Sequence, residues 1–367
     1  MVAVVMAGGG TAGHTSPLIA TAERLRDLAP DVAITCIGTA RGLETRVIPA
    51  AGLALELVPP VPLPRRLTPE LLKVPGRLAG AVREARRIIR AAQADVVVGF
   101  GGYVSMPAYL AARTLRLPVV IHEQNAVPGL ANKVAARFAT VVGVTFPGTP
   151  LPRARFLGMP LRRGIARLDR DAVRAEARAE LGLRADGPVL LVSGGSQGAR
   201  AINEATQGAR SALLAVGTDV LHVLGPKNFD PASHVVETDA TTGARYVPVA
   251  FVDRMERAYA AADLMVGRSG AGTVMETAVV GLPCIFVPLP HGNGEQARNA
   301  DFILAAGAGR LVPNAEFTAE RLLAEAGPLL ADPEARAAMS AKLTGLVPAD
   351  AAGDLARLIL ECARKES

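Results

Sequence analysis

The 367-residue sequence contains no tryptophan, and aromatic residues make up only 4% of the chain. It has three cysteines, an odd number, and none lies in a Cys-x-x-Cys motif or beside a histidine. This pattern argues against a disulfide framework and favours a reducing cytoplasm. No run of 18 uninterrupted apolar residues occurs, so we expect no membrane-spanning helix. The N-terminal residues VAVVMAGGG follow Met1 without a basic region and predict a strand, not a signal peptide.

The distribution of charge is more informative than its total. The chain carries a net charge of +6, and the segment Pro64–Arg90 alone holds eight basic and two acidic residues, which gives it the same net charge. Leucine, isoleucine and valine residues alternate with these arginines, as in amphipathic segments that bind anionic lipid headgroups. The alternative is a solvated helix face whose apolar residues pack inward. We expect no nucleic-acid partner, because the sequence has no helix-turn-helix or RNA-binding motif.

Four strand–loop–helix units recur along the chain and indicate an α/β fold. Each has a short apolar strand, a glycine-rich turn and a helix; the strands read VAVVM, DVVVG, PVLLV and DLMVG, and the helices are predicted to begin near His14, Met106, Arg200 and Thr273. This alternation predicts parallel sheets with helices on both faces. Ligands of such doubly wound sheets bind beyond the carboxyl ends of the strands, where all four turns fall.

The length of the chain suits two domains. Proline and glycine residues between positions 147 and 165 interrupt both periodicities, and we interpret this stretch as an interdomain linker. It separates an N-terminal domain, residues 1–160, from a C-terminal domain, residues 161–345. Residues 346–367 are helical in pattern and form a final element.

The first glycine-rich turn, GGGTAGH at residues 8–14, has two interpretations. A nicotinamide-dinucleotide site needs an acidic residue at the end of the second strand, but there the sequence continues Thr39-Ala40-Arg41. We favour a backbone-lined turn that presents His14 at a helix start. A neutral imidazole there could act as a general base near neutral pH. A capping or core histidine is the alternative without chemistry.

The segment 267–300 predicts a nucleotide-diphosphate site. Its glycines allow a tight turn after a strand, so that backbone N–H groups at the next helix start can face a diphosphate. Glu276 lies about one turn into that helix, where its carboxylate could accept hydrogen bonds from both hydroxyls of a ribose. An ordinary strand–helix turn with an exposed glutamate is the alternative. The turn GGSQGAR, residues 194–200, is a second candidate for anion binding.

Polar residues also follow two strands of the N-terminal half. GGYVS at 101–105 presents Tyr103, and HEQN at 122–125 presents Glu123 and Asn125 directly beyond the apolar strand PVVI. An α/β protein builds its site at such positions.

We expect neither a metal nor a cofactor. No His-x-x-x-His spacing adds zinc ligands to His122. The sequence Asp-Arg-Asp at 169–171 resembles a metal-binding acid pair, but its place before a charged helical segment favours a helix N-terminus.

Together, these motifs resemble the MurG family, peripheral-membrane N-acetylglucosaminyltransferases that complete lipid II in bacterial peptidoglycan synthesis. The resemblance runs along essentially the whole chain, through GGGTAGH, GGYVS, HEQN, GMPLR, GGSQGAR, GRSGAGTVMETA, GLPCIFVP and EQARNA in this order. It implies the GT-B fold, in which two Rossmann-like doubly wound domains face each other across a deep cleft. In this family the C-terminal helix packs back on the N-terminal domain.

The resemblance also implies where the substrates bind. His14 would be the catalytic base, with Glu123 as the second candidate. UDP-GlcNAc would lie on the C-terminal domain, with Glu276 on the ribose and Gln296 on the GlcNAc hydroxyls. The full set of implied substrate-binding residues is Thr11, Ala12, Gly13, Tyr103, Asn125, Arg162, Gly195, Ser196, Val252, Ala271, Gly272, Thr273, Val274, Met275, Glu276 and Gln296.

The implied reaction is inverting transfer of GlcNAc from UDP-GlcNAc to the 4-hydroxyl of lipid I, the undecaprenyl-linked MurNAc-pentapeptide. The implied location is the cytoplasmic face of the cell membrane, with residues 64–90 on the anionic surface and cell-wall synthesis and division proteins as further partners. Two alternatives stay open. A UDP-GlcNAc 2-epimerase of the same fold would react without a lipid acceptor, and a non-catalytic lipid-surface binding protein would release no UDP.

Overall fold

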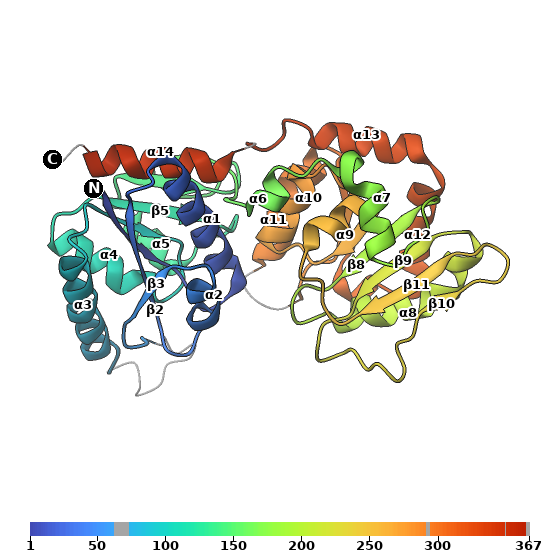
Figure 1. Cartoon of the computed structure of the whole chain (residues 1–367), viewed down its shortest axis with the longest axis horizontal. Coiled ribbons are helices and arrows are strands. Elements are labelled where there is room, and N and C mark those ends of the chain that lie inside the picture. The colour runs from blue at the N-terminus through green and yellow to red at the C-terminus, as the bar shows by residue number, and fades with distance from the viewer. Residues whose placement is uncertain (62–72, 291–293, 349, 365–367) are drawn as a thin grey trace. The chain divides into compact units, whose positions relative to one another are not determined.

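The computed structural model describes residues 1–61, 73–290, 294–348 and 350–364. The chain forms two compact units (Figure 1). Unit 1 comprises residues 1–162 together with 350–367, and unit 2 comprises residues 163–349.

Unit 1 is built on a seven-stranded sheet with the strand order β3-β2-β1-β4-β5-β6-β7, in which all neighbouring strands are parallel. The strands β1 and β4 are continuous apolar runs because helices cover both faces of the sheet. The elements of unit 1 are β1 (Ala3–Ala7), α1 (Ala12–Leu28), β2 (Ala33–Gly38), α2 (Glu44–Ala50), β3 (Ala54–Leu57), α3 (Val74–Ala91), β4 (Val96–Gly99), α4 (Ser105–Thr114), β5 (Val119–Glu123), α5 (Leu130–Ala135), β6 (Val141–Val144), β7 (Ala154–Phe156) and α14 (Ala351–Arg364).

Two buried cores lie on the two faces of this sheet. On one face, Ile88 and Ile89 of α3 pack with Tyr109 of α4. On the other face, Leu18 of α1 packs in the same core as Leu355 of α14. Helix α14 therefore packs against α1 and belongs to unit 1 (Figure 1).

Unit 2 has a second seven-stranded sheet, with the order β10-β11-β9-β8-β12-β13-β14. Among the described strands of this sheet, only β10 and β11 form an antiparallel pair. The elements of unit 2 are α6 (Arg163–Ala166), α7 (Arg170–Glu180), β8 (Val189–Ser193), α8 (Arg200–Ala215), β9 (Asp219–Val223), β10 (Glu237–Thr238), β11 (Arg245–Val249), α9 (Met255–Ala261), β12 (Leu264–Gly267), α10 (Ala271–Val279), β13 (Cys284–Phe286), α11 (Glu295–Ala305), β14 (Gly309–Leu311), a 3₁₀ turn (Asn314–Glu316), α12 (Ala319–Ala331) and α13 (Pro333–Leu343).

The structure confirms the predicted strand–loop–helix units and corrects the predicted linker. The four helices begin at Ala12, Ser105, Arg200 and Ala271, within two residues of the predicted starts. The stretch 147–165, however, contains the edge strand β7, which pairs in parallel with β6. Its three residues are all exposed, so no apolar pattern marks this strand in the sequence.

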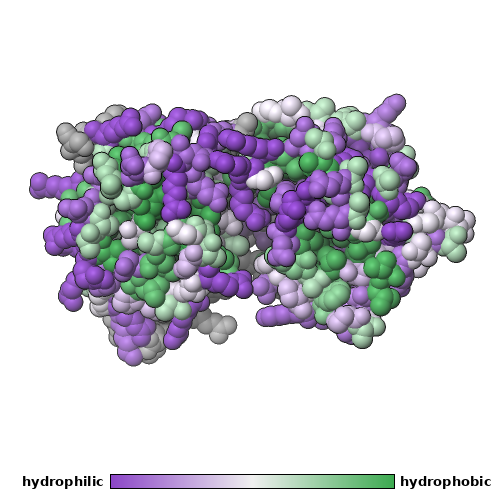
Figure 2. All heavy atoms as spheres, in the orientation of Figure 1, coloured by the Kyte–Doolittle hydropathy of each residue, from purple (hydrophilic) through white to green (hydrophobic). Residues whose placement is uncertain are grey.

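No membrane-spanning helix occurs in the part of the chain that the structure describes. Its helices are either too short or too polar to cross a bilayer. On the face drawn in Figure 2, hydrophilic side chains are spread over both units and interrupt the hydrophobic ones.

Candidate active site

His14 lies where three turns of unit 1 meet. The strands β1, β4 and β5 are neighbours, so the segments that follow them share the carboxyl edge of the sheet. The half-buried His14 ring, in the first turn of α1, has its Nδ1 atom 2.9 Å from Oε1 of Gln124. Gly101 and Gly102 adopt φ angles of +79° and +76°, and a Cβ added to either would lie within 3.5 Å of the ring. These glycines therefore let the turn after β4 approach the imidazole closely.

Glu123 is buried, and its carboxylate accepts three hydrogen bonds. Oε1 accepts from the Asn125 backbone N–H at 3.0 Å, and Oε2 accepts from the Gly129 N–H at 3.0 Å and from Asn132 Nδ2 at 2.9 Å. Tyr109 donates its hydroxyl to Asn132 Oδ1 at 2.7 Å, and burial raises the pKa of Tyr109 so that this proton stays in place. The carboxylate thus anchors the segment 125–129 in front of α5.

Glu44, which sequence reasoning missed, closes the first glycine-rich turn. Its buried carboxylate accepts from the Gly10 N–H at 2.8 Å and from the N–H and hydroxyl of Thr39 at 3.0 and 2.9 Å. Burial alone would raise the pKa of Glu44, but the hydrogen bonds from Gly10, its own N–H and Thr39 together lower it. An internal carboxylate therefore already accepts the Gly10 N–H, so this donor of the turn is not available to a phosphate.

Substituting Glu44 by glutamine tests this clamp. At pH 7 we expect the variant to lose about 1–3 kcal/mol of stability, because buried donors lose a charged acceptor. Because the pKa of Glu44 is lower in the folded than in the unfolded state, ionisation of its carboxylate stabilises the fold at pH values above the unfolded-state pKa of about 4.3. This stabilisation is lost as the pH falls through the folded-state pKa. The stability gap between wild type and variant should therefore narrow below about pH 4.3 in urea unfolding.

The matched control is Glu204→Gln, which changes an exposed glutamate paired with Arg200. We expect its stability to stay within about 0.5 kcal/mol of the wild type. A Glu44→Gln variant as stable as the wild type at pH 7 would contradict the clamp.

In unit 2, the turn after β8 is held rigidly by backbone packing. Gly198 has a φ of +73°, and a Cβ added to it would collide with the carbonyl of Leu224. Asn228 donates its Nδ2 to the carbonyls of Gln197 and Leu224, both at 3.0 Å. The tip of the turn, with Ser196, is exposed. A ligand would therefore meet a preformed turn.

The start of α10, after the neighbouring strand β12, is open to an anion. Its N-cap residue is Gly270, and no side chain of the described residues caps the helix. Helices α7 and α12, by contrast, are capped by the side chains of Asp169 and Thr318. The Asp169 cap confirms that the sequence at 169–171 is a helix N-terminus. At α10, the first N–H groups and the positive end of the helix dipole are available to a diphosphate.

Glu276, one turn into α10, has a partner that the sequence did not indicate. The hydroxyl of the buried Tyr259, on α9, donates to Oε2 of Glu276 at 2.6 Å. Tyr259 lies 17 positions away in an ordinary helix, so no local motif marks it. Gln296, the other predicted sugar contact, accepts the Leu289 N–H with its Oε1 at 3.0 Å. The side chains of Glu276 and Gln296 are therefore each oriented by a hydrogen bond within unit 2.

The predicted site residues fall into two sets, one on each unit. Unit 1 carries Thr11, Ala12, Gly13, His14, Tyr103, Glu123, Asn125 and Arg162, and unit 2 carries Gly195, Ser196, Val252, Ala271, Gly272, Thr273, Val274, Met275, Glu276 and Gln296. In unit 2, Val252, Val274 and Met275 have buried side chains, so their backbones are what a ligand could contact. No group of three or more His, Cys, Asp or Glu that could hold a metal occurs among the residues described.

Two Rossmann-like doubly wound units define the fold class, that of the GT-B glycosyltransferases. Similar folds include the calicheamicin glycosyltransferase CalG4, with a TM-score of 0.68 at 17% identity over the whole of both chains. Residues 4–144 match the glycosyltransferase family 28 N-terminal domain, and residues 189–355 match the C-terminal domain of this family.

Similarity to individual proteins narrows the class. The chain is 62% identical over 370 residues to the UDP-N-acetylglucosamine--N-acetylmuramyl-(pentapeptide) pyrophosphoryl-undecaprenol N-acetylglucosamine transferase of Cutibacterium acnes, covering 99% of this chain and 98% of that protein. A protein of the same name from a Nocardioides species is 56% identical, with 98% and 97% coverage. The crystal structure of Acinetobacter baumannii MurG matches with a TM-score of 0.80 at 30% identity, covering 98% of this chain and 100% of that one. The chain therefore belongs to the MurG family, as its motifs predicted.

Proposed function

We propose that this protein is the inverting N-acetylglucosaminyltransferase that moves GlcNAc from UDP-GlcNAc to the 4-hydroxyl of lipid I and forms lipid II in peptidoglycan synthesis. The full-length relatives named above carry this activity in their names. One observation of the structure supports the donor half most directly: Glu276, oriented by Tyr259, lies one turn behind the uncapped start of α10. This arrangement suits a ribose joined to a diphosphate.

Unit 2 holds the donor in this proposal. The N–H groups at the start of α10 and the turn of Gly195 and Ser196 bind the diphosphate and stabilise the negative charge on the departing UDP. The backbone of Val252 contacts uracil, and Gln296 contacts the GlcNAc hydroxyls. Arg162, at the end of unit 1, lies near the nucleotide.

Unit 1 supplies the acceptor side and the base. His14 removes the proton of the attacking 4-hydroxyl, and Tyr103, whose side chain is 55% exposed, contacts the acceptor. The segment Thr11–Gly13 and Asn125 approach the transferred sugar. Glu123, with three hydrogen bonds to its carboxylate, holds Asn125 in position rather than taking a proton.

The decisive experiment is UDP release from UDP-GlcNAc with and without a short-chain lipid I analogue. We expect release that depends on the acceptor, together with a disaccharide product. Conversion of UDP-GlcNAc to UDP-ManNAc without an acceptor would identify the epimerase alternative. Failure of any acceptor to trigger UDP release would identify the binding-protein alternative.

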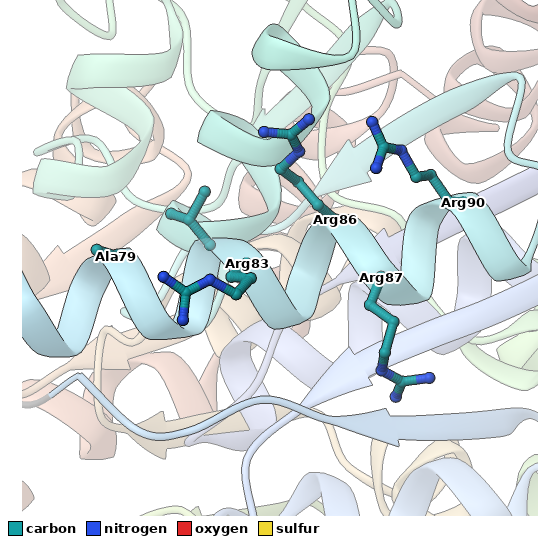
Figure 3. A pocket seen from close by; sticks show the side chains of 6 residues that line it. Ala79, Arg83, Arg86, Arg87 and Arg90 are labelled. Carbon is teal, nitrogen blue, oxygen red and sulfur yellow. The ribbon is translucent and has the colours of Figure 1, made fainter.

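We also propose that α3 docks the enzyme on the anionic cytoplasmic face of the cell membrane, where cell-wall synthesis and division proteins would be its neighbours. A shallow groove of about 640 Å³ on α3 is lined by four arginines, Ala79 and Val82 (Figure 3). Arg86 and Arg90 extend to one side of the helix and have no ion-pair partner among the described residues, whereas Arg87 extends to the other side and pairs with Glu84 at 2.7 Å.

For two apolar residues of α3, the structure agrees with the alternative in which they pack inward. Ile88 and Ile89 are buried against the sheet, so they cannot insert into lipid. The portion 64–72 of the predicted segment lies outside the described residues. The docking proposal therefore depends on the charge of α3.

Replacing Arg86 and Arg90 together by glutamine should weaken binding to phosphatidylglycerol vesicles about 30-fold at low ionic strength. Each basic residue near an anionic surface contributes about 1 kcal/mol, and high salt should abolish the difference. Co-sedimentation measures the partition coefficient. The control, Arg321→Gln with Arg357→Gln, makes the same change in net charge at arginines that already pair with carboxylates. If both double variants lost vesicle binding equally, the net charge of the protein, and not the position of the arginines on α3, would determine binding.

A further inference from the structure

Behind His14 lies a chain of hydrogen bonds whose direction can be deduced atom by atom. Gln124 bridges two histidines: its Oε1 lies 2.9 Å from His14 Nδ1, and its Nε2 lies 3.1 Å from His122 Nδ1 and 2.9 Å from the His122 carbonyl. The other ring nitrogen of His122, Nε2, lies 2.8 Å from the carbonyl of Gly158. Gln124 and His122 are buried, and none of these atoms belongs to the predicted substrate contacts.

The direction of the chain follows from its two backbone carbonyls, which only accept hydrogen bonds. The Gly158 carbonyl requires a proton on His122 Nε2. Burial lowers the pKa of His122 to about 4, so at neutral pH its ring is neutral and its Nδ1 carries no proton. The His122 carbonyl requires that the nearer amide atom of Gln124 is the NH₂ group. The other amide atom, which faces His14, is therefore the oxygen.

We propose that Gln124 is a positioning residue that holds His14 in the tautomer with the proton on Nδ1, so that Nε2 is the basic atom. Because the Gln124 oxygen can only accept, His14 Nδ1 must donate, and a neutral imidazole then keeps its free lone pair on Nε2. The inference rests on the proposed function in one respect, the use of His14 as the base. The tautomer itself can be measured without any reaction.

The surroundings of the ring agree with this assignment. A Cβ added to Gly102 would lie 3.4 Å from His14 Cδ2 and 3.8 Å from Nε2. A side chain at position 102 would thus contact the edge of the ring that carries Nε2, and the glycine avoids this contact. A hydroxyl that is to lose its proton has to reach that atom.

The test is ¹⁵N NMR of histidine-labelled protein at neutral pH, combined with kinetics of three variants. In the wild type, we expect the His14 Nδ1 resonance at a protonated shift and Nε2 at an unprotonated shift. Gln124→Met has a side chain of similar length but no acceptor oxygen, so His14 should no longer prefer the tautomer with the proton on Nδ1. We expect kcat to fall about 10- to 30-fold, which is part of the 10²–10⁴-fold that a general base contributes. Donor affinity should stay within about twofold. Gln124→Glu, which keeps an acceptor oxygen, should restore the wild-type tautomer.

Gln207→Met is the matched control, because Gln207 pairs with His234 on the exposed surface of unit 2 at 3.0 Å. It should alter neither kcat nor the His14 resonances. A proton on Nε2 of His14 in the wild type would overturn the proposal, and so would a Gln124→Met variant with unchanged tautomer and kcat. If Gln124→Met does not fold, the wild-type and Gln124→Glu spectra decide. A measured Nδ1–H tautomer together with full activity of His14→Ala would instead overturn His14 as the base.

Discussion

The His14→Ala variant is expected to lose about 10²–10⁴-fold in kcat while its affinity for UDP-GlcNAc changes less than about twofold. The imidazole lies at the junction of the three turns of unit 1, and its Nδ1 lies 2.9 Å from Oε1 of Gln124. The residues that we assign to the nucleotide lie on unit 2. Loss of the base should therefore slow the chemical step without removing a nucleotide contact. Steady-state kinetics with a soluble lipid I analogue and calorimetric titration of the donor measure the two quantities separately.

His234→Ala provides the control, because this histidine lies on unit 2 and its contacts with Gln207, Phe229 and Asp230 are at the surface. Its kcat should equal that of the wild type. A fall of less than tenfold for His14→Ala would assign the imidazole a structural role and would leave the base to another group.

For the donor site, Glu276→Ala should weaken UDP-GlcNAc binding about 30- to 150-fold, which corresponds to roughly 2–3 kcal/mol for a charged acceptor of two hydroxyl hydrogen bonds. The ribose is remote from the bond that breaks, so its contacts contribute equally to ground state and transition state. The KM for UDP-GlcNAc should therefore rise while kcat at saturating donor stays close to the wild-type value.

Tyr259→Phe separates the orientation of this carboxylate from its presence. The variant keeps the ring and removes the hydroxyl that donates the 2.6 Å hydrogen bond to Glu276. We expect a smaller loss of donor affinity, about 5- to 10-fold, consistent with one hydrogen bond to a charged group. An unchanged KM in Glu276→Ala would refute the ribose assignment, whatever the result for Tyr259→Phe.

Much of the fold could be predicted because its signals are local. A parallel strand buried on both faces has to be a short apolar run, and the glycines after it are required by the tight approach to the next helix. Neither burial nor a tight turn restricts the residues of the edge strand β7 or of the exposed arginine side of α3. The short strand went unrecognised within a linker, and the pattern of α3 left open whether its isoleucines meet lipid or pack inward, as they do against the sheet.

The sequence by itself determined the two doubly wound units, the family, and the positions of His14 and Glu276, because each depends on a motif of neighbouring residues. Only the tertiary structure decided what those side chains are bonded to. His14 meets Gln124 across 110 positions because β1 and β5 flank β4 in one sheet, and Glu276 meets Tyr259 because α9 and α10 belong to one unit. The direction of the hydrogen bonds behind His14 depends on the carbonyl of Gly158, 36 positions beyond His122. Such partners are specified by strand order and packing, which local periodicity does not encode.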